Sequence, residues 1–214
     1  MIGKGKSISH GVAALEYDLA KEIDGQAVAT EIARHELYGC TGAEMVQEMK
    51  PYFTDFPNVK NNCLRFEVSP SIEESSSFTD ADWAELGNDF MQRMGLMNHQ
   101  YIIIRHSGTE SKKEQAHLHI LANRISLSGE LYRDNWIGKR ATEAANAIAK
   151  ERNFVQSQDI GKANKAEIKE AMNSVLKKMQ GFDLTKFQEE LGKLGFKVRE
   201  ARASTGKLNG YYVT

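Results

Sequence analysis

Hydrophobic residues recur along several segments of the chain at three- or four-residue steps, which predicts amphipathic helices. The first such segment is 9–21. The clearest is 79–97, where tryptophan, leucine, phenylalanine and methionine form one apolar stripe. A capping box at Thr41–Glu44 predicts the start of another helix, which Pro51 should end. Further helices are predicted at residues 27–37, 136–154, 165–179 and 183–194.

Strands are predicted where apolar and β-branched residues cluster in shorter runs. Segment 62–69 is one strand, and segments 101–106 and 116–125 form a predicted hairpin around a polar loop. A second hairpin, 195–203 with 208–214, closes the chain. Strands that are interspersed with helices and joined as hairpins predict an α+β fold, with a central antiparallel sheet flanked by helices.

Length and composition fit a single domain over residues 1–214. The chain has 214 residues, of which 41% are hydrophobic, enough to build a core. No apolar run approaches the roughly 18 residues of a membrane span, and no apolar segment follows the N-terminal lysines, so we expect neither membrane insertion nor secretion. Two cysteines, Cys40 and Cys63, are too few for a disulfide scaffold, which indicates the cytoplasm. The chain stops directly after a predicted strand, as the N-terminal part of a longer protein would.

Charge is distributed unevenly. The net charge of −1 gives no overall sign of nucleic-acid binding. Residues 161–214, however, hold 11 Lys and Arg against 6 Asp and Glu. This basic helical and hairpin part is therefore a candidate for contacts with phosphates.

Two histidines stand one residue apart in the predicted strand AHLHILANRI. Because successive side chains of a strand point to opposite faces, His117 and His119 share one face while Leu118 and Ile120 point to the core. Hairpin pairing can bring His106, at the end of the preceding strand, beside them. Three neutral imidazoles would leave positions open for water or substrate, as a catalytic metal needs. The alternative is that all three are ordinary half-exposed histidines on a polar face of the sheet.

Tyr17 lies opposite the apolar stripe of the first predicted helix. A buried tyrosine would join that stripe, so this side chain is expected to face outward. One interpretation is that it is simply exposed or packs on a neighbouring element. The other is that it attacks phosphorus, and because a phenol is mostly protonated at neutral pH, that role needs a base or a metal ion.

Three segments together resemble the relaxases of mobilisable plasmids and conjugative elements: GKSISHGVAALEYDLAKE, HQYIIIRHSGTE with AHLHILANRI, and STGKLNGYYV. More narrowly, they resemble the P-type mobilisation class (MOBP) of HUH endonucleases, in the forms found on mobilisable elements of Bacteroides-like bacteria. The resemblance extends over essentially the whole chain and implies an HUH-endonuclease fold.

The resemblance implies a DNA relaxase that nicks one strand at an origin of transfer (oriT) and later rejoins it. His106, His117 and His119 match the residues that hold a divalent cation against the scissile phosphate. Mg²⁺ or Mn²⁺ is the expected ion, and Zn²⁺ and Ni²⁺ are alternatives. Tyr17 matches the nucleophile, which forms a 5′-phosphotyrosyl link and releases a 3′-hydroxyl.

The chain departs from the family at one position. Relatives commonly carry Asp two residues after the first histidine of the motif, where this chain has Gly108. That acid is expected to support a ligand histidine, so Glu110 or Glu67 would have to replace it. We favour Glu67 because a charged residue in a central strand needs a reason, although an outward-facing position is an equal alternative. Asn123 and Arg124 match the end of the motif, and we expect one of them to brace the site or contact phosphate.

The expected substrate is single-stranded or hairpin oriT DNA in the cytoplasm of a bacterium. Relaxosome accessory proteins and the coupling protein of a type IV secretion system are the expected partners. Stacking aromatic residues are also expected, but none is assigned from the sequence. The candidate phosphate contacts, each of which is also compatible with a solvated surface position, are Lys4, Lys6, Arg105, Lys112, Lys113, Arg124, Arg199, Arg202 and Lys207.

Three other functions are compatible with the sequence. A rolling-circle replication initiator would use the same chemistry on its own replicon. A non-catalytic oriT-binding accessory protein would explain Gly108. A metal hydrolase of small phosphodiesters would turn over without covalent attachment to its substrate.

Overall fold

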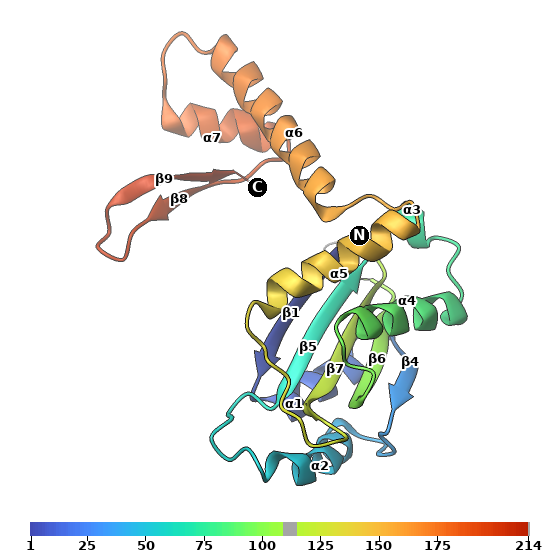
Figure 1. Ribbon diagram of the computed structural model, residues 1–214. Helices are drawn as coiled ribbons and strands as arrows, with labels where there is room; N and C mark the ends of the chain where they lie inside the picture. Colours follow the sequence, from blue (N-terminus) through green and yellow to red (C-terminus); the bar gives the residue numbers. More distant parts are fainter. Residues whose placement is uncertain (109–114, 214) are drawn as a thin grey trace. The chain divides into compact units, whose positions relative to one another are not determined.

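The computed structural model describes residues 1–108 and 115–213 and divides the chain into two compact units, Met1–Ser157 and Gln158–Thr214. The first unit is built on a five-stranded sheet with the strand order β1-β5-β7-β6-β4, in which all neighbouring strands are antiparallel (Figure 1). The α+β class and the central antiparallel sheet are thereby confirmed. That residues 1–214 act as one nicking domain stays a prediction.

The elements of the first unit, in chain order, are β1 (Ile2–Ile8), α1 (Gly11–Leu19), β2 (Glu22–Ile23), β3 (Gln26–Ala27), β4 (Ala29–His35), α2 (Gly42–Phe53), β5 (Cys63–Ser69), α3 (Ile72–Ser75), α4 (Asp80–Arg93), β6 (His99–His106), β7 (His117–Ser126) and α5 (Ile137–Glu151). Those of the second unit are α6 (Ser157–Lys178), α7 (Leu184–Lys193), β8 (Val198–Arg202) and β9 (Leu208–Val213).

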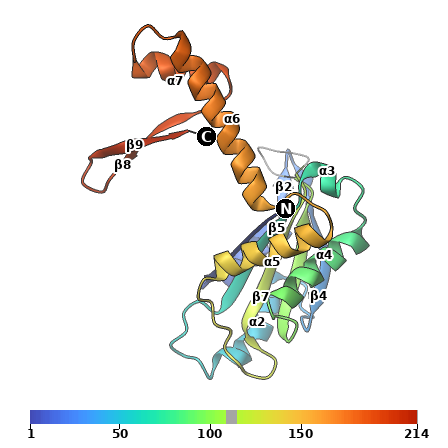
Figure 2. The same ribbon diagram turned by 45° about the horizontal axis from the view of Figure 1, so that its top comes forward.

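Helices cover both faces of the central sheet. α4 and α5 lie side by side on one face, while α1 and α2 pack on the other (Figure 1, Figure 2). On β7, Ile120 belongs to the core cluster that contains Phe90 of α4, whereas its neighbour Leu121 belongs to the cluster that contains Leu15 of α1. The alternation of side chains along β7 therefore decides which helices each residue meets.

Strand β1 was not among the predicted elements because its inward-facing residues are glycines. A Cβ atom at Gly3 would lie 2.5 Å from the carbonyl oxygen of Ala141 and 2.6 Å from Cβ of Ala145. A Cβ atom at Gly5 would lie 2.8 Å from the ring of Phe66. The missing side chains let α5 pack directly on the strand, and they also remove the apolar alternation by which a strand is predicted.

The helix predicted at residues 27–37 is wrong, because this segment contains strand β4. β4 is an edge strand that pairs with β6, and its register shifts between Glu31 and Ala33. Such an irregularity breaks the two-residue alternation. The strand is also only partly buried along most of its length, so neither of its faces has the row of buried apolar residues that predicts a strand.

Most other predicted elements are present. Both hairpins, β6–β7 and β8–β9, form as expected, and the Thr41–Glu44 capping box starts α2. α2 nevertheless continues past Pro51 to Phe53. Pro51 lacks the N–H group for one helical hydrogen bond. Because it lies in the last turn, few helical residues follow it.

The second unit has a small core of its own. Val175, Phe187 and Leu191 are its buried residues, and the hydrophobic residues packed against them include Val198 and Val213 of the terminal hairpin. Within the described part of the chain, every helix is either too short or too polar to cross a bilayer.

Candidate functional site

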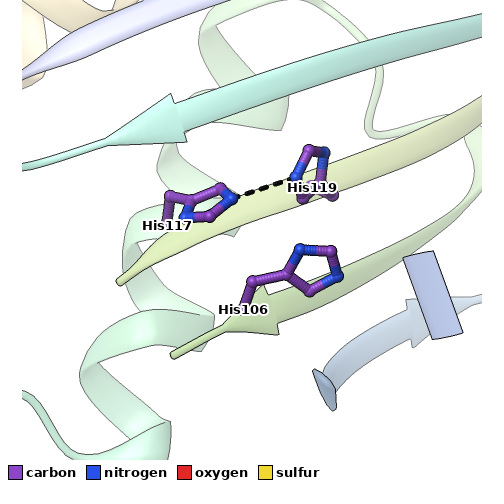
Figure 3. Close-up of side chains that lie close together, drawn as sticks. All are labelled: His106, His117 and His119. Carbon is purple, nitrogen blue, oxygen red and sulfur yellow. Dashed lines mark hydrogen bonds between the residues drawn. The ribbon is translucent and has the colours of Figure 1, made fainter. Parts of the chain in front are cut away.

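The three histidines of the sequence motif meet on the α1 face of the sheet. The β6–β7 register places His106 opposite His117, and His119 lies two residues further along β7. Their imidazoles point toward one another (Figure 3), with one ring nitrogen of each within 4.8 Å of the others. The Nε2 atoms of His117 and His119 are 3.1 Å apart. Two of the three rings, those of His106 and His117, are buried.

The second nitrogen of two of these rings is held by a backbone carbonyl. His117 donates from Nδ1 to the carbonyl oxygen of Gln115 at 3.0 Å, which leaves its Nε2 with a free lone pair. His106 donates from Nε2 to the carbonyl oxygen of Asp18 at 2.7 Å, which leaves its Nδ1 free. Such outer partners fix the orientation and tautomer of metal-binding histidines.

Two of the histidines, His106 and His119, are also held in the form that binds a metal ion. Burial is the largest cause of the lowered pKa of His106. At His119, burial together with the neighbouring histidines and Arg65 lowers the pKa to about 2. Both rings are therefore neutral at physiological pH, as metal coordination requires. Three imidazole nitrogens at this spacing are a donor set that fits a divalent metal ion.

A buried carboxylate, Asp18 of α1, lies beside the third histidine. Its Oδ1 is 3.8 Å from Nδ1 of His119, and its side chain is 1% exposed. Arg65 of β5 donates to both oxygens of this carboxylate, with Nε 3.1 Å from Oδ2. Nη2 of Arg65 also lies 3.3 Å from Nδ1 of His119. Burial raises the pKa of Asp18, and the charge of Arg65 acts against this shift.

Asp18 was missed in the sequence, although a signal was present. The buried residues of α1 are Gly11, Ala14, Leu15 and Asp18, so a charged residue continues the buried face of the helix. An acid in that position needs a partner. The predicted stripe was turned slightly away from this face, since Val12 is exposed.

Of the two acids proposed from the sequence, the structure describes only Glu67, which is not bonded to the histidines. Glu67 pairs in register with His119 across β5 and β7, but its carboxylate accepts a hydrogen bond from Nζ of Lys4 at 2.9 Å. Glu110 lies outside the described residues. Asp18 therefore lies in the place beside His119 that was expected for Glu67, and a role of Glu67 in the site stays a prediction.

Tyr17 faces outward from α1, as predicted, and its side chain is 56% exposed. Its hydroxyl oxygen accepts a hydrogen bond from Nζ of Lys21 at 2.8 Å. The next residue in the chain is Asp18, which contacts His106 through its backbone and lies near His119 through its side chain. The structure thus places the helix that carries Tyr17 directly against the histidine cluster.

A pocket of about 210 Å³ adjoins the cluster and has His119 in its wall. Strands β1 and β5 supply the rest of its lining, which includes Lys4, Lys6, Arg65 and Glu67. Both lysines are exposed. Because Lys4 and Lys6 alternate with the glycines under α5, they point to the same face of the sheet as the histidines.

Three other residues of the predicted site are held by bonds elsewhere in the fold. Arg105 bonds to Asp80 of α4, on the face of the sheet opposite to His106. Arg124 donates to the carboxylate of Asp134 at 2.7 Å and to two backbone carbonyls. Asn123 is fully buried and bonds to Gln100 and to the backbone of Ile125. The structure thus gives these residues contacts within the fold. The roles expected for them, in DNA contact or in bracing the site, stay predictions.

The remaining basic candidates fall into two groups. Lys112 and Lys113 lie outside the described residues. Arg199, Arg202 and Lys207 belong to the second unit, on β8 and the turn that follows it.

The nuclease-domain model of the MobA/VirD2-like relaxases matches residues 17–154, a range that contains Tyr17 and all three histidines. The chain belongs to this relaxase family. The relaxase identity implied by the sequence is therefore confirmed at the level of the family.

Among solved structures, the chain is similar to the conjugative relaxase TrwC in complex with oriT DNA. The metal-bound structure is 12% identical, with a TM-score of 0.40, over 97% of this chain and 74% of that one. The metal-free structure is 11% identical, with a TM-score of 0.27, over 97% of this chain and 66% of that one. No curated protein sequence matches the chain.

Replacing Asp18 by Asn is expected to weaken divalent metal binding by about 10- to 100-fold, the range typical of lost outer-shell carboxylates. The amide keeps the size of the side chain but loses the charge beside Nδ1 of His119. Titration calorimetry with Mn²⁺ would measure the affinity, on protein whose fold is checked by thermal unfolding. Glu67→Gln is the matched control and should bind Mn²⁺ as the wild type does. The opposite ranking of the two variants would return the supporting role to Glu67.

Proposed function

We propose that this relaxase domain nicks and rejoins one DNA strand at the origin of transfer of a mobilisable element, as a member of the P-type class found on Bacteroides-type elements. The observation that carries the proposal is the cluster of three histidines packed against the helix of an outward-facing tyrosine. Membership of the relaxase family supports it, because both parts of the site fall within the matched range.

In this proposal, His106, His117 and His119 hold a divalent ion, Mg²⁺ or Mn²⁺, with Zn²⁺ and Ni²⁺ as alternatives. When bound, such an ion neutralises negative charge on the non-bridging oxygens of the scissile phosphate. Asp18 and the carbonyl oxygen of Gln115 keep the rings in place. The neutral state of His106 and His119 is the state that this role requires.

Tyr17 is the proposed nucleophile. Its phenolic oxygen forms a bond to phosphorus while the bond to the 3′-oxygen breaks, and the 3′-oxygen takes up a proton in place of the one that the phenol loses. Nζ of Lys21, bonded to the phenolic oxygen, stabilises negative charge that develops there. Because a phosphodiester is exchanged for a phosphodiester, the 3′-hydroxyl can later attack the phosphotyrosine and restore the strand.

The pocket beside His119 is the proposed path of the strand next to the scissile phosphate. Lys4 and Lys6 supply positive charge along it, and Arg65 lies between them and the histidines. Single-stranded or hairpin oriT DNA is the proposed substrate, in the bacterial cytoplasm. Relaxosome accessory proteins and a type IV coupling protein are the proposed partners, and Glu67 remains a candidate residue in the wall of this pocket.

The proposal is tested with a single strand that carries the oriT of the element encoding the chain, labelled at either end. Wild-type protein with Mn²⁺ is expected to cut the strand, to carry the downstream fragment covalently, and to leave a free 3′-hydroxyl on the other fragment. Excess EDTA should stop the reaction. Cleavage without a covalent adduct would favour a phosphodiesterase, and DNA binding without cleavage would favour an accessory protein. A rolling-circle initiator is separated by asking whether loss of the gene stops replication or only transfer of its replicon.

A further inference from the structure

The terminal hairpin β8–β9 has two faces of different character. Directly paired residues of an antiparallel ladder point to the same side. Val198 pairs with Val213, and both pack against the small core of the second unit. Arg199 pairs with Tyr212 and therefore points to the opposite side. We call the side that carries Arg199, Ala201, Gly210 and Tyr212 the outer face.

Basic side chains on the outer face lack partners among the described residues. On the other side, Arg202 bonds to Glu200 and to the carbonyl oxygen of Gly206. The side chain of Arg199, by contrast, makes no hydrogen bond or ion pair with any described residue, and the same holds for the side chain of Lys197, which precedes β8. Both side chains are exposed.

An aromatic ring is exposed among these charges. Tyr212 is 65% exposed, although tyrosine usually buries most of its ring. Its neighbours on the outer face are the small residues Ala201 and Gly210, which pair with each other. The residue paired with Tyr212 is therefore an arginine, and the next pair on the outer face has no bulky side chain. The far end of the hairpin projects beyond α7 (Figure 1).

The positive charge of the hairpin indicates which class of ligand it would bind. Residues 195–214 contain four basic side chains and one acidic side chain. An exposed ring beside unpaired cations matches a polymer that offers flat, unpaired rings together with phosphates. Single-stranded nucleic acid has both, whereas duplex DNA hides the faces of its bases in the stack.

We propose that the outer face of β8–β9 binds single-stranded DNA, with a base stacked on Tyr212 and phosphates on Arg199 and Lys197. The proposal rests on the proposed function in one respect, since that function makes DNA the polymer that this chain meets. It adds a second DNA-binding surface, built by the second unit and independent of the histidine cluster.

The test uses the full chain and a fluorescent oligothymidine without a nic site, in EDTA, so that neither cleavage nor a metal ion is needed. Tyr212→Leu is expected to lower the affinity about tenfold, as loss of one stacked base does. Tyr212→Phe keeps the ring and should bind as the wild type does. Tyr211→Leu, at the adjacent ring on the other face, is the matched control and should stay within about twofold.

Salt dependence separates stacking from charge. Arg199→Gln should reduce the slope of log affinity against log salt by about 0.7, the value for one single-strand phosphate contact, whereas Tyr212→Leu should leave the slope unchanged. Wild-type affinity in Tyr212→Leu, or equal losses in Tyr212→Leu and Tyr212→Phe, would overturn the proposal. Duplex DNA that binds as tightly as the single strand, with no effect of Tyr212→Leu, would also overturn it. Because this test measures binding and not nicking, its result could be interpreted even if the proposed nicking function were wrong.

Discussion

Tyr17→Phe is expected to lower strand cleavage and covalent attachment to DNA to below about one thousandth of the wild-type rate. The change removes one oxygen atom, which is the proposed nucleophile. The fold should be unaffected, because the ring is more than half exposed and its hydroxyl bonds to the flexible side chain of Lys21. End-labelled oriT strands on a denaturing gel would measure cleavage, and the mobility shift of the protein in SDS would measure the adduct.

Tyr38→Phe is the control for this experiment. Tyr38 is also exposed and also bonds through its hydroxyl to one charged side chain, that of Glu36. The Tyr38→Phe variant should cleave the DNA strand and attach to it covalently as the wild type does. Persistence of the adduct in Tyr17→Phe would assign the nucleophile to another residue. Cleavage without an adduct in both wild type and variant would contradict the transesterification chemistry itself.

Replacing any one of His106, His117 and His119 by Gln is expected to abolish cleavage and to weaken Mn²⁺ binding by more than the 10- to 100-fold loss typical of outer-shell changes. Each ring supplies one nitrogen to a cluster whose ligand atoms lie within 4.8 Å of one another, so the loss of one leaves an incomplete donor set. Calorimetry with Mn²⁺ measures the affinity directly. Thermal unfolding gives a second measure, because Mn²⁺ should raise the melting temperature of the wild type and not of the variants.

The exposed His10, which precedes α1, provides the control. His10→Gln should keep both the affinity and the shift in melting temperature. If all four histidine variants bound Mn²⁺ equally, the cluster would be no more than three neighbouring rings on a sheet face. If only His106→Gln retained binding, the site would be a two-histidine site completed by other ligands.

The site residues that lie close in sequence or repeat with a strand's period could be predicted. His117 and His119 are related by simple alternation, and the pairing of β6 with β7 as a hairpin left little choice for His106. Tyr17 was found because it breaks the pattern of its own helix. The three inner strands of the central sheet, β5, β6 and β7, followed from their apolar residues in the same way.

The remaining features depend on partners that are distant along the chain. The role of Asp18 depends on its contacts with Arg65 and His119, which lie on other strands. Glycines replace apolar residues on β1 because a helix more than a hundred residues later packs on them. Arg124 and Asn123 match a family motif, but their bonds to a nearby loop and strand could not be read from that match. Such features come from tertiary packing, which local patterns do not encode.

The neighbouring positions of Tyr17 and Asp18 on α1 have a geometric consequence. Consecutive residues of a helix leave its axis about 100° apart, and the backbone hydrogen bonds fix that angle. Asp18 is anchored by Arg65 under the helix, so α1 cannot turn about its axis without breaking that ion pair. The direction in which the phenol leaves the helix is thus set by the same contact that lies against His119. The orientation of the proposed nucleophile is therefore tied to the proposed metal site, and a residue inserted between Tyr17 and Asp18 would turn the phenol by about 100° relative to the anchored carboxylate.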